Sequence, residues 1–135
     1  MKKVYYILFV TLMIITTGAN GQSYKIKNNS MIKQVLIDKF FIPATSIEEF
    51  SKQMNNNRSF IKKLPGFIKD EVYKQTDKDG NLTIVTIAIW KDQESIDNAR
   101  SAVQTEYKRT GFNPAEFYQR LNIKMERGIY SEITD

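Results

Sequence analysis

Two stretches of the sequence decide the fold: Leu64-Pro65-Gly66-Phe67 and, further along, Ile84-Val85-Thr86-Ile87-Ala88-Ile89-Trp90-Lys91-Asp92. In the first stretch, proline cannot continue a helix and glycine readily adopts turn conformations, so a helix is predicted to stop there and a strand to start. The second stretch is rich in β-branched residues, which favour a strand. Its Asp92 is predicted to cap a following helix.

Ile32 to Ile42, upstream of the first stretch, is predicted to be a strand ended by Pro43. Its apolar residues fall on both faces, with Val35, Ile37 and Phe41 on one side and Leu36, Phe40 and Ile42 on the other. A strand that is apolar on both faces is typically covered on both faces.

Ser46-Ile47-Glu48-Glu49 has the pattern of a capping box, in which Ser46 caps a helix and Glu49 reaches back to the backbone. Apolar residues then recur at helical spacing up to Leu64, and Asn57 is a polar amide on the same stripe. The stripe comprises Ile47, Phe50, Met54, Ile61 and Leu64.

The remaining elements follow from turn and cap signals. Strands are predicted over Phe67 to Thr76 and Leu82 to Trp90, joined by a hairpin loop that contains an Asp-Gly pair. Helices are predicted from Asp92 to Thr110 and from Asn113, whose Asn-Pro start is typical of a cap. Ile123 to Ile133 is predicted to be the last strand. This strand-helix-strand-strand-helix-strand order is the ferredoxin-like α+β arrangement with a four-stranded antiparallel sheet.

The third strand is predicted to be largely apolar on both faces, because Val85, Ile87 and Ile89 alternate with Ile84, Ala88 and Trp90. Helices cover one face of such a sheet, and the other would lie in water in a monomer. Two sheets packed face to face would bury it. We therefore expect a homodimer built as a dimeric α/β barrel.

From roughly Ile32 to Ile133, the chain resembles the antibiotic biosynthesis monooxygenase family. The resemblance lies in the helix, the Pro-Gly-Phe turn, the strand hairpin and the aliphatic strand that ends at Trp90. The resemblance implies the ferredoxin-like fold and the dimeric barrel. It also implies cofactor-independent oxidation of a small aromatic or quinol compound, bound between sheet and helices, with no cofactor and no metal.

A site of this kind needs an apolar pocket, polar groups that hold a phenolate or enolate, and in some cases a base. Asp38 lies between apolar neighbours and is the candidate base; Asn57 is the second candidate catalytic residue. Trp90 matches the tryptophan that commonly closes the third strand in the family. The candidate substrate-binding residues are Tyr73, Trp90, Arg109 and Tyr118.

Each candidate also has a purely structural interpretation. Asp38 would then pair with a neighbouring lysine or arginine, Asn57 would reach water, Trp90 would pack in the core or a dimer contact, and Arg109 would complement a helix dipole. The alternative function is accordingly a non-catalytic dimeric barrel that binds a small apolar ligand. The content of the pocket separates the two functions, because an enzyme needs Asp38, Asn57 and a tyrosine around one open cavity.

Composition excludes several classes of site. The chain has no cysteine and no histidine, so thiol catalysis, a Ser-His-Asp triad and a histidine-ligated zinc or haem are ruled out. The net charge is +5, and no basic stripe with interleaved aromatics indicates nucleic-acid binding.

The N-terminus predicts export. Lys2 and Lys3 precede an apolar run from Val4 to Ile15, and small residues follow up to Gly21, which is the pattern of a cleavable signal peptide. The run is shorter than the roughly 20 residues of a membrane span. We expect a signal peptide over residues 1–21, a linker over 22–31, one domain over 32–135, and a periplasmic or secreted protein without a membrane anchor after cleavage.

Overall fold

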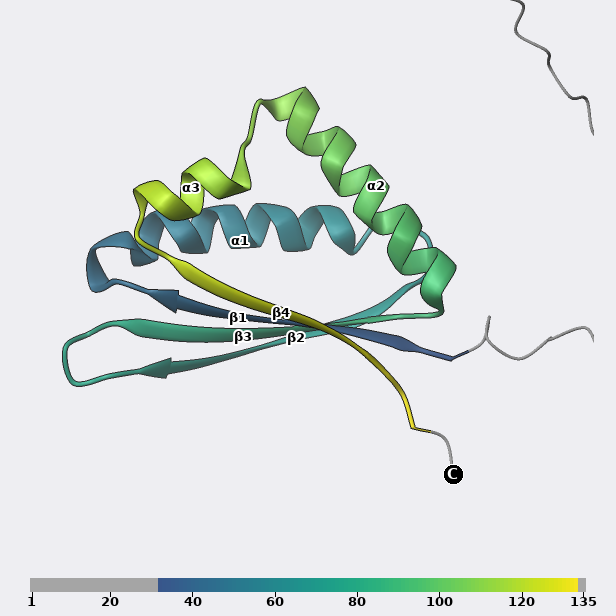
Figure 1. The fold of residues 1–135 in the computed structure, drawn as a ribbon, viewed down its shortest axis with the longest axis horizontal. Coiled ribbons are helices and arrows are strands. Elements are labelled where there is room, and N and C mark those ends of the chain that lie inside the picture. Colours follow the sequence, from purple (N-terminus) through teal and green to yellow (C-terminus); the bar gives the residue numbers. More distant parts are fainter. Residues whose placement is uncertain (1–31, 134–135) are drawn as a thin grey trace, which may run out of the picture.

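A computed structural model describes residues 32–133, and the predicted signal peptide and linker lie outside this range. The elements follow in the predicted order (Figure 1). They are β1 (Gln34–Ile42), the short 3₁₀ turn η1 (Ala44–Ser46), α1 (Ile47–Ile61), β2 (Phe67–Thr76), β3 (Leu82–Trp90), α2 (Gln93–Thr110), α3 (Pro114–Arg120) and β4 (Lys124–Ser131). The first and last strands are shorter than predicted, and the first helix ends before Leu64.

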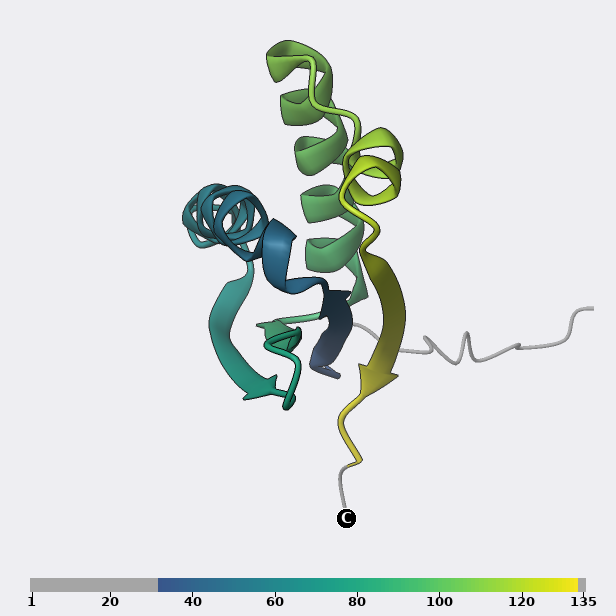
Figure 2. The same ribbon diagram turned by 90° about the vertical axis from the view of Figure 1, so that its left-hand side faces the viewer.

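The four strands form one antiparallel sheet in the order β2-β3-β1-β4, which confirms the ferredoxin-like α+β prediction. All three α-helices lie on the same side of this sheet, and no helix of residues 32–133 covers its other side (Figures 1 and 2). Alternation along the strands therefore divides the side chains into a helix-facing set and a set on the open face.

The predicted helix ends are confirmed at α2 and α3. The Asp92 side chain accepts a hydrogen bond from Ser95 N, and the Asn113 side chain accepts from the first amides of α3. Gly111 ends α2 with a φ of 70°, a left-handed conformation that glycine adopts at little cost.

The prediction of a capping box at Ser46 is wrong. Ser46 makes no side-chain cap, and its Oγ donates instead to the carbonyl oxygen of Leu121, at 3.0 Å. The chain already turns through η1 before α1 begins, so the hydroxyl is buried against the α3–β4 connection. Glu49 accordingly does not reach back but pairs with Arg120.

Gly66 holds the α1–β2 turn against the start of α2. Its φ is +80°, and a Cβ there would lie 2.1 Å from Ser95 Oγ. Its carbonyl accepts from Lys91 N at 2.8 Å, so the turn is bonded to the end of β3. Only glycine satisfies both the left-handed backbone and this close approach.

The core beneath the helices is divided into two clusters. One lies near the start of α1 and α3 and includes Phe40, Phe50 and Ile84, and the other lies near the start of α2 and includes Ala88 and Trp90. Between them each central strand places a polar residue on the helix-facing side. No helix among the described residues is long and apolar enough to cross a membrane.

Candidate functional site

A row of polar side chains crosses the sheet between the two core clusters. Asp38 on β1 lies opposite Thr86 on β3 and opposite Arg127 on β4. The neighbouring helix-facing positions on β1 are the apolar Leu36 and Phe40. The middle of the sheet therefore presents polar groups where a continuous core would present hydrocarbon.

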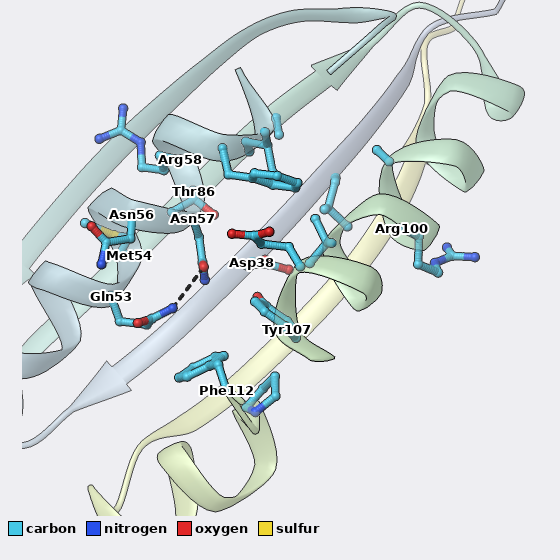
Figure 3. Close-up of a pocket in the computed structure, with 18 of the residues that line it drawn as sticks. Asp38, Gln53, Met54, Asn56, Asn57, Arg58, Thr86, Arg100, Tyr107 and Phe112 are labelled. Carbon is cyan, nitrogen blue, oxygen red and sulfur yellow. Dashed lines mark hydrogen bonds between the residues drawn. The ribbon is translucent and has the colours of Figure 1, made fainter. Parts of the chain in front are cut away.

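A cavity of about 980 Å³ lies over this row, between the sheet and the three α-helices. Its floor includes Asp38, Thr86 and Arg127, and α1 and α2 supply the walls. Figure 3 shows side chains from β1, β3, α1 and α2 facing this space. Most of the lining is apolar, and volumes of about 300–1,000 Å³ are typical of small-molecule sites.

Asp38 and Arg127 form a two-pronged ion pair at the floor. Arg127 Nε donates to Asp38 Oδ1 and Arg127 Nη2 to Asp38 Oδ2, both at 2.7 Å. The Asp38 side chain is 10% exposed, whereas that of Arg127 is 52% exposed. The hydrogen-bonded carboxylate raises the pKa of the Arg127 guanidinium, so a permanent positive charge borders the cavity.

Two tyrosines bring phenol groups to the same space. Burial raises the pKa of Tyr118, on α3, to about 12, and the neighbouring Tyr107 adds to this shift. Burial also raises the pKa of Tyr107, on α2. Both phenols are therefore neutral near pH 7 and are able to donate a hydrogen bond to an occupant.

Asn57 reaches into the cavity from α1. Gln53, one turn earlier on the same helix, donates from Nε2 to Asn57 Oδ1 at 3.0 Å, as the dashed line in Figure 3 shows. The Asn57 side chain also faces the Tyr107 phenol and opposes the rise in the pKa of Tyr107 that burial causes. Asn57 is thus held on the polar side of the cavity.

Trp90 lines the cavity and is also a core residue. Its side chain is buried, and its ring packs edge-on against Phe67 with centroids 5.5 Å apart. Its indole Nε1 has no hydrogen-bond partner among the described residues. A buried donor without a partner is costly, and such a group is suited to an acceptor that arrives with a ligand.

The structure brings Asp38, Asn57, Trp90 and Tyr118 together around one cavity, but it does not bring Tyr73 and Arg109 there. Tyr73 on β2 faces Val85 on the open side of the sheet and donates to Glu71. Arg109 lies at the exposed end of α2 and pairs with Glu106. The helix that carries Arg109 turns this side chain to solvent.

The cavity is also bordered by residues that were not predicted from the sequence as site residues, among them Gln53, Thr86, Tyr107 and Arg127. Tyr107 recurs at helical spacing with Ile96, Ala99 and Val103, so its phenol on an otherwise apolar stripe was a usable signal. Arg127 lies between Met125 and Ile129 on the helix-facing side of β4, and a charged residue between two apolar ones on one face was a second signal. Among residues 32–133, no group of three or more acidic side chains is arranged to hold a metal ion.

Comparisons with known proteins agree with this architecture. The family model described as antibiotic biosynthesis monooxygenase matches residues 34–109. No curated protein matches the chain.

Two solved structures illustrate the similarity. SnoaB, described as a cofactor-independent oxygenase from Streptomyces nogalater, is 22% identical with a TM-score of 0.57; the match covers 77% of this chain and 96% of SnoaB. A dimeric ferredoxin-like protein from an uncultured marine organism is 15% identical with a TM-score of 0.59; that match covers 77% of this chain and 98% of the other. At these identities, the similarity to these structures establishes the fold.

Proposed function

This chain belongs to the antibiotic biosynthesis monooxygenase family, and from that membership we propose that it is a cofactor-independent monooxygenase of a small aromatic or quinol compound. The proposal rests on one observation above all. An apolar cavity of about 980 Å³ is open over a polar floor, and polar groups from five different elements border it. Those groups are Asp38, Asn57, Tyr107, Tyr118 and Arg127.

The reaction requires the substrate to become an anion. Loss of a proton from a phenol, quinol or enol places negative charge on substrate oxygen and makes the ring carbon electron-rich enough to react with dioxygen. One oxygen atom then enters the product and the other leaves as water, and the substrate itself supplies the electrons. The protein has to accept the proton and stabilise the charge.

The cavity has groups for both tasks. Asp38 is the proposed proton acceptor, and because a carboxylate has about four lone-pair positions, the two bonds from Arg127 leave others free. Asn57, the neutral tyrosines and the unpartnered Trp90 Nε1 are the proposed donors to the developing oxyanion. The positive charge of Arg127 favours an anionic state nearby.

The rival function is a non-catalytic barrel that binds a small apolar ligand. A core filled by side chains would favour it. The Asp38–Arg127 ion pair fits this rival, because it is the structural role expected for Asp38. The open cavity favours the enzyme, because a purely apolar ligand would leave the indole N–H of Trp90 without a partner.

The test is oxidation of a panel of anthrones, quinols and phenols in air-saturated buffer, followed by product absorbance and by incorporation of labelled dioxygen. Asp38→Asn preserves shape and removes the acceptor, so we expect a loss of about 10²–10⁴ in rate. Asp97→Asn, on the exposed face of α2, is the matched control and should leave the rate unchanged. Failure of the wild-type protein to oxidise any panel member would favour the ligand-binding function. A folded Asp38→Asn variant with the wild-type rate would remove Asp38 as the base.

The proposal includes a homodimer. The open face of the sheet carries Val35, Ile37, Val85, Ile87 and Ile89 side by side, since each lies at the alternate register positions of β1 and β3. A second copy packed on this face would take a large apolar surface out of water. We further propose that the protein acts outside the cytoplasm, on the strength of the predicted signal peptide.

A further inference from the structure

Gln53 has no direct role in the proposed reaction, yet it borders the cavity and contacts the amide of Asn57. The two residues are four apart on α1, a spacing that places side chains next to one another on one helix face. Both are partly buried. The contact is therefore a partly buried feature of the cavity wall and not a fully solvated surface pair.

The direction of this hydrogen bond decides what Asn57 presents to an occupant. Gln53 Nε2 donates to Asn57 Oδ1 at 3.0 Å, so the oxygen of the Asn57 amide is engaged by α1 itself. The Asn57 NH₂ group then remains for the cavity. Figure 3 shows this amide between Gln53 on one side and the Asp38 carboxylate and Tyr107 ring on the other.

We propose that Gln53 is a positioning residue that holds the Asn57 amide with its NH₂ group toward the cavity, so that Asn57 acts as a hydrogen-bond donor to an ionised substrate oxygen. This inference rests on the proposed function, because it assumes that the occupant carries an acidic hydroxyl. An amide is chemically ambivalent, and without a partner its oxygen and nitrogen exchange places by a simple rotation. The bond from Gln53 Nε2 engages the oxygen of Asn57 and so sets which end of this amide faces the cavity.

Two further observations concern the groups around Asn57. The Asn57 side chain opposes the effect of burial on the pKa of Tyr107, so the two groups belong to one polar cluster at the cavity. The Asp38–Arg127 pair at the same floor is neutral as a unit, so a further donor such as the Asn57 NH₂ group is needed to favour an ionised occupant.

The test measures the ionisation of a bound probe and does not depend on turnover. A hydroxyanthraquinone absorbs differently as phenol and as phenolate, so its pKa in the complex is read by titration. Gln53→Glu replaces the donor by an acceptor, which should turn the NH₂ group of Asn57 away from the cavity. The new charge would also raise the probe pKa directly, so the same change is made in an Asn57→Ala background.

We expect Gln53→Glu to raise the pKa of the bound probe by about one unit more when Asn57 is present than when it is alanine, since a hydrogen bond to a charged group is worth roughly a tenfold change in ionisation or more. Asp38, Tyr107, Tyr118 and Arg127 face the probe in all four proteins, so their effects cancel in this comparison. Gln53→Met, which has no donor and no charge, should shift the probe pKa in the same direction by less.

Equal shifts in the two backgrounds would overturn the positioning role while leaving the proposed function intact. If the wild-type protein binds no hydroxylated aromatic probe, both the proposed function and this inference are wrong. Thermal unfolding of each variant establishes that the fold is retained, which is expected because Gln53 and Asn57 are only partly buried.

Discussion

Replacing Arg127 by leucine tests the energetic importance of the ion pair at the cavity floor. The substitution leaves the Asp38 carboxylate, whose side chain is 10% exposed, without its two hydrogen bonds. Breaking a fully buried pair in this way costs about 3–5 kcal/mol, whereas exposed pairs contribute about 0–1 kcal/mol. Because the Arg127 side chain is 52% exposed, water reaches the vacated space, and we expect an intermediate loss of about 2 kcal/mol.

For a domain of about 100 residues, this loss corresponds to a fall of roughly 10 °C in Tm. Thermal and urea unfolding are the assays. Arg120→Leu is the matched control, because it breaks an equally well-aligned pair with Glu49 in which both side chains are at least half exposed. It should change Tm little.

The double variant Asp38→Leu/Arg127→Leu separates an orphaned charge from a lost contact. Removing both partners should restore much of the stability that Arg127→Leu loses, since leucine at position 38 would join Leu36 and Phe40 beside it. If Arg127→Leu were no more destabilising than Arg120→Leu, or if the double variant were the least stable of all, the reasoning about a buried carboxylate would be refuted.

Three other predictions concern the ionisation of Tyr118, the assembly of the protein and its export. Burial raises the pKa of Tyr118 from 10.0 to about 12, so the unfolded chain loses this proton first and stability falls between about pH 10 and 12. Tyr118→Phe should reduce this loss of stability at alkaline pH, as measured by urea unfolding. An unchanged dependence of stability on pH would contradict the burial of the Tyr118 phenol. Sedimentation at micromolar concentration should give twice the monomer mass, and Ile87→Lys on the open face should give a monomer; a monomeric wild type would refute the barrel. N-terminal sequencing of the exported protein should begin near Gln22, and an intact Met1 would refute cleavage.

The order and nature of the elements could be predicted from sequence because their signals are local. Pro65-Gly66 forms the turn after α1, Asp92 caps α2, and the Asp-Gly pair closes a hairpin through contacts a few residues long. The same locality explains the error at Ser46, whose sequence fits a capping box but whose hydroxyl bonds to Leu121, 75 residues away.

The candidate site could be predicted only in part. Alternation along the first strand placed Asp38 on a face, helical spacing placed Asn57 on a stripe, and both residues border the cavity. Tyr73 and Arg109 were included for their chemistry alone, and the structure places them away from the cavity. Chemical type carries no information about which side of an element a group occupies.

The sequence by itself therefore determined the element order, the two faces of the central strands and the absence of thiol and imidazole chemistry. Only the tertiary structure decided that Asp38 pairs with Arg127, 89 residues further along the chain, and that a cavity stays open above them. The physical reason is register. Which residues lie opposite one another in β1 and β4 depends on the packing of the whole sheet and its helices, and no signal within a few residues specifies that alignment.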